Sequence, residues 1–312
     1  MAVVQDLHIL PRYEESIGYL YVEHCNVEQD EKAIAANTVN GRIRVPCADL
    51  NCLLLGPGTT LTHAAVKTLA ESGTSIVWTG EDMVRCYAQG TGETRSSANL
   101  LRQISVWSDE EDRLTVIRKM YEMRFDEVLD KTLTLRQIRG MEGGRVRQAY
   151  WHWSKETGIP WNGRNYKTAS WQDADPINRA ISTANACLYG ICHAAIVSIG
   201  MSPALGFVHT GKQLSFVYDI GDLYKTDICL PVAFQTVANN EAGLETVVRT
   251  KCREQFYNTR LMKRIINDLR KLFFEATDLD ENYDSNAAQP GELWDNAEGV
   301  LPGGKNYDLE HS

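Results

Sequence analysis

The chain has 312 residues, 43% of them apolar, so it can bury a substantial core, and its length favours two domains over one. No continuous apolar run suggests a membrane span, and the N-terminus lacks the basic start and apolar core of a secretory signal. The formal charge of −9 is concentrated in residues 277–312, which hold nine acids and one lysine. Residues 1–276 hold 31 bases and 32 acids, so they can still present a basic face to nucleic acid.

The eight cysteines form no C-x-x-C pair and mostly stand among apolar residues. This pattern predicts reduced thiols in a cytoplasmic protein, and it argues against disulfides or a zinc site.

Residues 1–90 carry the pattern of a β-rich domain. Residues 16–24 are rich in aromatic and β-branched side chains, and Asn40-Gly41 between alternating segments predicts a hairpin. Residues 62–73 predict one short helix, with Thr62 as its N-cap and Gly73 at its end. Two more strands are expected at residues 74–80 and 83–90.

From about residue 95 the apolar period becomes helical, which predicts an all-α domain over residues 91–276. After a first helical stretch up to about residue 130, helices are expected at 133–157, 176–199, 214–239 and 243–275. Residues 277–312 are acidic, contain Pro and Gly and show little periodicity, so a disordered tail is expected. The predicted fold class is α+β.

A polar stripe crosses the otherwise apolar helix at 176–199. Asn178, Ser182, Asn185 and Tyr189 follow at i, i+4, i+7 and i+11, which places them on one face. An exposed polar stripe and the lining of a polar cleft are equally compatible with this spacing.

Glu142 is surrounded by glycines and arginines. Gly140, Gly143 and Gly144 each cost a helix about 1 kcal/mol relative to alanine, so another helix or a ligand is expected to approach this backbone closely. Four arginines lie nearby: Arg136, Arg139, Arg145 and Arg147. Taken alone, Glu142 is expected to pair with an arginine rather than to bind metal.

Residues 206–225 combine apolar side chains with His209, Asp219 and Asp222. The two acids are three apart and so are neighbours on a helix. An isolated histidine is more often a core residue, and D-x-x-D is a weak motif that also occurs in helical enzymes binding diphosphates through magnesium. Two carboxylates and one imidazole could nevertheless ligate Mg²⁺ or Mn²⁺, with Glu142 as the candidate third carboxylate. The bases of helix 243–275 could form a solvated face or follow a phosphate backbone.

Several long segments together resemble a known family. These segments are "LGPGTTLTHAAVKTLAESGTSIVWTGE", "RGMEGGRVRQAY", "INRAISTANACLYG", "ALGFVHTGKQLSFVYDIGDLYK" and "VVRTKCREQF". In this order and spacing they resemble the CRISPR-associated integrase, the metal-dependent endonuclease of spacer acquisition (CRISPR adaptation), and look closest to subtype I-E. The similarity covers most of residues 10–265.

The resemblance implies a β-sandwich-like N-terminal domain, a helical catalytic domain and a homodimer. It further implies that two such dimers flank a dimer of a small ferredoxin-like subunit. That complex holds a prespacer DNA duplex and inserts its 3′ ends at the CRISPR leader–repeat. The implied cofactor is Mg²⁺ or Mn²⁺, which would act on the scissile phosphodiester.

The resemblance also implies roles for individual residues. Glu142, His209 and Asp222 would be metal ligands, and Asp219 would support them. Tyr189, Lys212 and Lys225 fall in or beside the active site, where a lysine could stabilise charge developing on the phosphate. Positions on the DNA-binding side are Lys67, Arg85, Arg249 and Arg253.

The chain departs from the family pattern at two positions. His24 aligns where relatives place a tyrosine that stacks on splayed DNA, with Tyr21 as a neighbouring alternative, and Thr60 stands where some relatives have arginine. Two rival functions remain: a helical magnesium enzyme acting on a small diphosphate, and a non-catalytic DNA-binding scaffold whose acids only pair with arginines.

Overall fold

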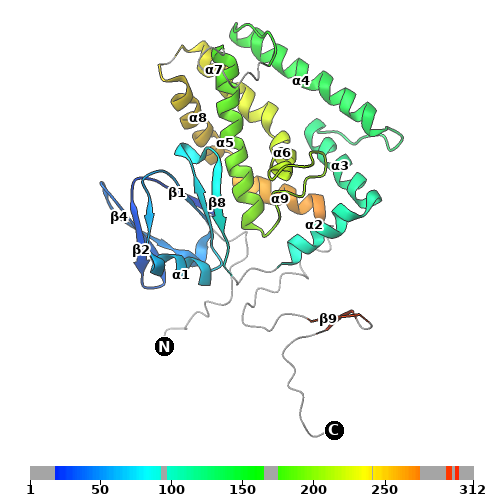
Figure 1. Cartoon of the computed structure of the whole chain (residues 1–312). Coiled ribbons are helices and arrows are strands. Elements are labelled where there is room, and N and C mark those ends of the chain that lie inside the picture. Colours follow the sequence, from blue (N-terminus) through cyan, green and yellow to red (C-terminus); the bar gives the residue numbers. More distant parts are fainter. Residues whose placement is uncertain are drawn as a thin grey trace.

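The computed structural model describes residues 18–92, 97–164, 175–240, 242–274, 293–296 and 299–301. Strands come first in the chain and helices follow (Figure 1), so the predicted α+β class with a β-rich N-terminal part is confirmed. The part of the predicted strand 16–24 that is described forms β1 (Gly18–Val22).

Two four-stranded sheets make up the N-terminal part, as the predicted sandwich requires. One has the order β1-β5-β7-β8 and the other the order β4-β3-β2-β6. The remaining strands of the first sheet are β5 (Leu50–Leu55), β7 (Ser75–Thr79) and β8 (Cys86–Gly90). The second sheet comprises β2 (Asn26–Asp30), β3 (Ala33–Thr38), β4 (Gly41–Pro46) and β6 (Thr60–Leu61).

Local signals in this part act as expected. The Asn40-Gly41 turn joins antiparallel β3 and β4, where Thr38 pairs with Gly41 and the glycine has φ 130°. Helix α1 (His63–Glu71) begins after Thr62, whose hydroxyl accepts the backbone N–H of Ala65 at 3.2 Å. The N-cap thus satisfies one of the free donors of the first turn.

Strand β5 lies between two hydrophobic cores, one on each of its faces, and all six of its residues are buried. Leu53 and Leu55 pack with the second sheet and α1. Cys52 and Leu54, on the opposite face, pack with the helices. The period-2 alternation of a strand therefore lets one short segment anchor both halves of the chain.

The helical part comprises α2 (Ala98–Ser108), α3 (Glu110–Phe125), α4 (Leu135–Thr157), α5 (Pro176–Ser198), α6 (Ser215–Asp222), α7 (Leu230–Ala238), α8 (Leu244–Asn258) and α9 (Leu261–Phe273). Helix α5 runs through the middle of this part, with the first sheet on one side and other helices around it (Figure 1). By length and composition α5 could cross a membrane, contrary to the sequence expectation, but 78% of its most apolar window is buried inside the protein. It serves as the core helix.

Two predicted helices are each broken in the structure. The segment 214–239 forms α6, a π-helical turn at Lys225–Cys229 and α7, and Pro231 in the first turn of α7 lacks the N–H that a continuous helix would use. The segment 243–275 divides at Arg260, which adopts φ 47°. The buried residues Phe256 and Leu261 are five positions apart, a spacing that does not fall on one face of a straight helix. In an unbroken helix, Leu261 would therefore point away from the core that Phe256 faces.

The sheet and the helices meet at a short 3₁₀ turn, η2 (Glu81–Met83), and at strand β8. The ring Nε2 of His193 on α5 lies 2.7 Å from the side-chain oxygen of Gln89 on β8. Burial lowers the pKa of His193 to about 4, so the ring is neutral at pH 7. Beside it, Gly190 of α5 lies directly under the carbonyl oxygen of Met83.

The predicted disordered tail, residues 277–312, lies mostly outside the described residues. Its described part is a pair of short antiparallel strands, β9 (Leu293–Asp295) and β10 (Gly299–Leu301).

Gly190 and Gly140 make a matched pair for measuring this contact, because both lie inside helices. A Cβ at Gly190 would collide with the Met83 carbonyl oxygen, whereas nothing lies within 4 Å of one at Gly140. Gly190→Ala should therefore destabilise the protein by about 1–3 kcal/mol. Gly140→Ala should stabilise it by about 0.5–1 kcal/mol. Chemical denaturation measures both, and shifts of the same sign would contradict this account.

Candidate active site

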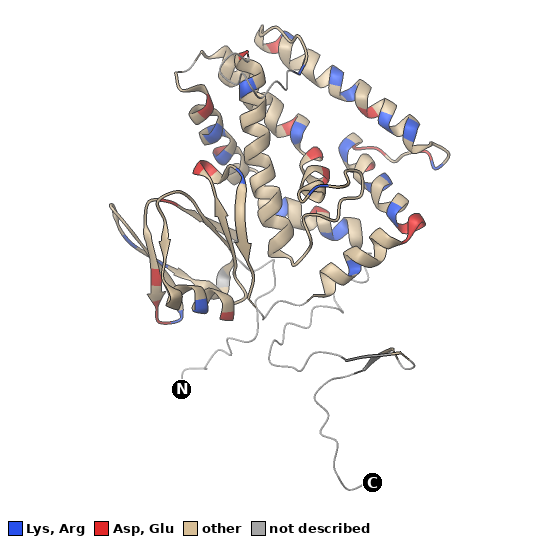
Figure 2. Ribbon diagram, viewed as in Figure 1, with Lys and Arg blue, Asp and Glu red and all other residues tan. Residues whose placement is uncertain are grey.

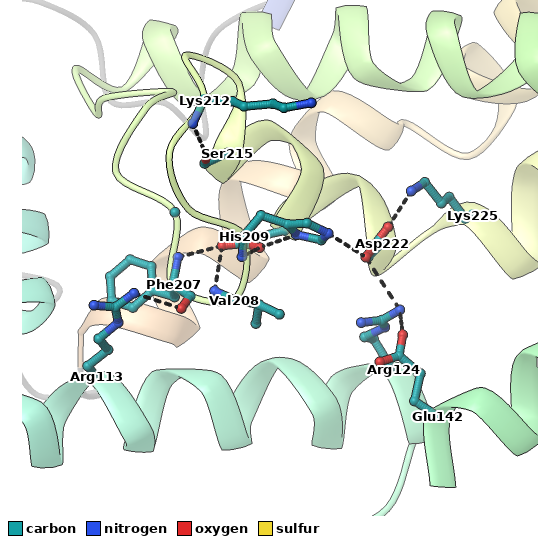
Figure 3. Close-up of polar contacts among 12 residues, drawn as sticks. Arg113, Arg124, Glu142, Phe207, Val208, His209, Lys212, Ser215, Asp222 and Lys225 are labelled. Atoms are coloured by element: carbon teal, nitrogen blue, oxygen red, sulfur yellow. Dashed lines mark hydrogen bonds and ion pairs between the residues drawn. The ribbon is translucent and has the colours of Figure 1, made fainter. Parts of the chain in front are cut away.

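Three acids and one histidine predicted for the site come together from three parts of the chain. Figure 3 shows Glu142, His209 and Asp222, and Asp219 lies against His209. Glu142 comes from α4, Asp219 and Asp222 from α6, and His209 from the loop that precedes α6. They lie around one polar centre beside α3, which contributes Arg124.

Asp219 organises the loop that carries His209. Its carboxylate is fully buried and accepts the backbone N–H groups of Phe207, Val208 and His209 at 2.6, 3.1 and 2.9 Å. The same carboxylate lies 2.7 Å from His209 Nδ1. This bond raises the pKa of His209 above its ordinary value, against the opposing effect of burial. With Nδ1–H donating to Asp219, the neutral ring presents a free lone pair at Nε2.

Asp222 is the carboxylate that this imidazole faces. Its Oδ2 lies 4.0 Å from His209 Nε2 and 3.6 Å from Arg124 Nη2, and its Oδ1 contacts the Lys225 ammonium. The side chain is 14% exposed. Asp222 is therefore bordered by three cationic or potentially cationic groups.

Glu142 forms an ion pair with the same Arg124 guanidinium. Burial raises the pKa of Glu142; Arg124 counteracts this effect and Asp222 adds to it. The expectation that Glu142 pairs with an arginine is confirmed, but the partner comes from α3 and not from the four arginines near it in sequence. Among the described residues, no three His, Cys, Asp or Glu side chains are grouped in a way that could hold a metal ion.

Lys225 and Tyr189 also lie beside Asp222. Burial works against the charge of Lys225, but Asp222 and Tyr189 outweigh it and raise the lysine pKa. Lys225 Nζ lies 4.9 Å from the centre of the Tyr189 ring, and burial raises the pKa of Tyr189. That ring packs directly on Gly221, where a Cβ would overlap it. Glycine at 221 thus lets Tyr189 reach the site.

The polar stripe on α5 is not an exposed one. Asn178 is buried and Ser182, Asn185 and Tyr189 are half-buried. Arg164 donates to Ser182 Oγ at 3.0 Å and to Asn178 at 3.2 Å.

Lys212 lies on the loop before α6 but not in the cluster. It is exposed, its backbone N–H donates to Ser215 Oγ at 3.0 Å, and its side chain lies apart from Asp222 (Figure 3).

No helix of the described chain approaches the glycines of α4. Nothing lies within 4 Å of a Cβ built at Gly140, Gly143 or Gly144. Of the two neighbours expected there, a helix is therefore not found among the described residues, and a ligand stays a prediction. Ile138 is the one buried residue of this 23-residue helix. Leu135, Ala149, Tyr150 and Trp153 also pack against the core, and the more exposed part of the helix carries several bases (Figure 2).

Two arginines predicted to bind DNA contact acids of η2, the turn between β7 and β8. Arg253 contacts Asp82 at 2.6 Å, and Arg249 contacts Glu81 at 2.8 Å and Asp82 at 3.6 Å. Arg85, in the same segment as these acids, is exposed. Asp82, Met83 and Arg85 all have φ between 52° and 65°, which is unusual for residues other than glycine.

The other predicted DNA contacts lie elsewhere. Lys67 is exposed on α1, at the end of the sheets away from α8 (Figure 1), and pairs with Glu71 at 3.6 Å. His24 is exposed at the turn between β1 and β2. Tyr21 is half-buried, donates to Glu23 at 2.6 Å and accepts the Asp82 N–H at 2.9 Å.

Sequence reasoning missed Arg124, Glu81 and Asp82. Arg124 follows Ile117, Met120 and Tyr121 by seven, four and three residues, so it lies on the buried face of α3. A charge at such a position was the available signal, but only the tertiary contacts with Glu142 and Asp222 show its partners. Glu81 and Asp82 lie in a short turn between strands, where acids are common.

Comparisons with known proteins agree on one family. A family model described as CRISPR associated protein Cas1 matches residues 123–271. The chain is 49% identical over 305 residues to "CRISPR-associated endonuclease Cas1 2" of Thermus thermophilus, covering 97% of this chain and 94% of the relative. It is 40% identical over 254 residues to "CRISPR-associated endonuclease Cas1" of Escherichia coli, covering 81% and 83%.

Solved structures agree with this match. The protein in the crystal structure of a TtCas1–DNA complex has TM-score 0.77 and 51% identity, covering 85% of this chain and all of that one. A Cas1 protein from Thermotoga maritima has the same fold, with TM-score 0.58 at 15% identity over 81% of this chain and 94% of that one. On these similarities, this chain belongs to the CRISPR-associated Cas1 family.

Proposed function

We propose that this protein is a CRISPR adaptation integrase. It inserts the 3′ ends of a captured DNA duplex into a CRISPR array by phosphoryl transfer, and it has an associated DNA endonuclease activity. The observation that carries the proposal is the arrangement of Asp222 beside His209, with buried Asp219 holding the imidazole and Arg124 joining Glu142 to Asp222. The endonuclease names of the relatives and the DNA in the TtCas1 complex support the substrate class.

The chemistry of these side chains fits a divalent cation. Two carboxylates and an imidazole nitrogen suit Mg²⁺ or Mn²⁺, and the imidazole tilts the preference toward Mn²⁺. The hydrogen bond from His209 Nδ1 to Asp219 is the support that metal-ligating histidines usually have. Glu142, His209 and Asp222 would hold the ion, provided that Arg124 moves from between the two carboxylates.

When bound, the ion would act as a Lewis acid on the scissile phosphodiester and lower the pKa of the attacking 3′-hydroxyl or water. The chain's own groups have three further roles. Lys225, held between Asp222 and Tyr189, stabilises negative charge on the phosphate oxygens. Asp219 keeps the His209 ring and its loop in one orientation. Lys212, exposed on that loop, contacts the DNA beside the reacting centre.

DNA runs over the basic surfaces around this site. Arg249 and Arg253 share Asp82, and exposed Arg85 follows three residues later in the chain. Lys67, on α1, would make a separate contact at the other end of the sheets. The open glycine face of α4 allows a DNA backbone to come close to Glu142. His24 is the better candidate for stacking on a splayed base, because it is exposed whereas the Tyr21 hydroxyl is already engaged.

The assembly follows from the same resemblance. We propose a cytoplasmic protein of subtype I-E, with a dimerising and DNA-contacting domain at residues 1–90 and a catalytic domain at 91–276. Two homodimers would flank a dimer of the small ferredoxin-like subunit.

A non-catalytic scaffold is the alternative that one observation favours, because Arg124 pairs with Glu142 as that function predicts. The two functions differ in their response to metal. A thermal melt with and without Mn²⁺ separates them, since only the integrase is stabilised by the ion.

Removing a proposed ligand should abolish the reaction. We expect His209→Ala and Asp222→Ala to lose strand transfer while DNA binding stays largely intact, because the metal site is lost but the basic surfaces remain. The assay uses purified protein, its small partner, Mn²⁺ and a supercoiled target carrying a repeat. His152→Ala, which removes an exposed histidine on α4, is the matched control and should retain activity. Retained integration in either ligand variant would remove that residue from the site.

Proton binding at His209 should depend on Asp219. The folded-state pKa is raised, so this interaction stabilises the fold below the unfolded-state pKa of about 6.5 and is lost as pH rises through the folded value. Asp219→Asn removes the negative charge and should lower the pKa of His209. NMR titration of the metal-free protein measures it. An unchanged midpoint would mean that Asp219 does not control the imidazole.

Arg249 and Arg253 should contribute to DNA affinity through phosphate contacts. The double variant Arg249→Gln/Arg253→Gln should weaken binding for all sequences and reduce the slope of log K against log salt by about two. Lys271→Gln removes a 67%-exposed charge on α9 and is the control. Equal slopes in wild type and double variant would place the DNA elsewhere.

A further inference from the structure

Arg124 occupies the centre of the candidate active site. Its Nη2 contacts Glu142 Oε1 and lies 3.6 Å from Asp222 Oδ2, so one guanidinium nitrogen links carboxylates from two different helices (Figure 3). The side chains of Arg124, Glu142 and Asp222 are 14%, 20% and 14% exposed. The contact is therefore largely shielded from water.

The neighbouring cations do not share this position. Lys225 contacts Asp222 through the other carboxylate oxygen, Oδ1. His209 faces Oδ2 of Asp222 at 4.0 Å, and its Nδ1 is held by Asp219. Among the described residues, Arg124 is the one base whose ion pairs join Glu142 to Asp222.

Two half-buried carboxylates facing each other repel unless a cation lies between them. A guanidinium and a divalent ion are alternative solutions, because Arg124 contacts the same two carboxylates, Glu142 and Asp222, that would hold the ion. The centre of the Tyr121 ring, on the same helix, lies 5.4 Å from the guanidinium carbon of Arg124. The arginine thus has a positioning contact besides the two carboxylates.

We propose that Arg124 is a built-in counter-ion that holds the metal-free site together and must leave the carboxylates before a divalent cation can bind. Arg124 thereby sets the metal affinity of the site. The inference rests on the proposed metal site of Glu142, His209 and Asp222. An arginine that served only as a structural ion pair would instead help to assemble the ligands, and its loss would weaken metal binding.

The test measures Mn²⁺ binding to the DNA-free, full-length protein by isothermal titration calorimetry, without reference to activity. Arg124→Gln should bind Mn²⁺ on the order of tenfold more tightly than wild type, which corresponds to about 1.4 kcal/mol. Its metal-free melting temperature should fall, because the carboxylates lose their counter-ion, and saturating Mn²⁺ should close the gap. Arg147→Gln makes the same charge change on α4, where Arg147 donates to Gly143 O of its own helix, and should leave Mn²⁺ affinity near the wild-type value.

Arg124→Lys is the second variant if Arg124→Gln does not fold. It keeps the charge but replaces the guanidinium fork with a single ammonium, and an affinity between those of wild type and Arg124→Gln is expected.

The outcomes separate the two proposals. If wild type binds Mn²⁺ and Asp222→Asn does not, but Arg124→Gln binds no more tightly than Arg147→Gln, the counter-ion inference is overturned and the metal site stands. If neither wild type nor Arg124→Gln binds Mn²⁺, the metal site itself fails and the inference fails with it.

Discussion

The site depends on one buried carboxylate. Asp219 accepts three consecutive backbone N–H groups and an imidazole N–H, and it has no exposure to water. A loop has few backbone partners of its own, so these bonds determine its path. Because Asp219 sits on α6 one turn before Asp222, the same short helix fixes both the loop that carries His209 and the acid that His209 faces. The three-residue spacing of the two acids on α6 thus determines how the His209 loop and Asp222 lie relative to each other.

Charge compensation explains why the surrounding helices meet where they do. Asp222 and Glu142 lie near enough to share Arg124, and Lys225 neutralises the remaining oxygen of Asp222. Each of these ions would be costly to leave half-buried alone. The π-helical turn at Lys225–Cys229 lies directly after α6 and contributes the lysine. The break in the regular helix thus places Lys225 beside Asp222.

The sequence predicted most of the architecture because local signals dominate there. The Asn40-Gly41 turn, the Thr62 cap and the start of α5 at Pro176 are all decided by neighbouring residues. The two helix breaks were not predicted, because each one turns the chain so that its apolar residues keep facing the core. A helical repeat of apolar residues in the sequence does not show such a turn. Family resemblance named Glu142, His209 and Asp222, and the structure brings them together. The helical spacing places Arg124 on the buried face of α3, but no pattern identifies its partners, which are 18 and 98 residues away.

The neutral histidine between sheet and helices limits the acid tolerance of the fold. His193 has a pKa of about 4 in the folded protein, against about 6.5 in the unfolded chain. Above pH 6.5 the ring is neutral in both states and does not lower the free energy of unfolding. As pH falls toward 4 the unfolded chain binds a proton that the folded protein does not, which lowers the free energy of unfolding by about 3 kcal/mol for a buried ring. His193 lies at the interface between α5 and β8, close to the contact of Gly190 with the Met83 carbonyl oxygen, so the destabilisation acts at this interface. Mild acid should therefore weaken the packing of α5 against β8.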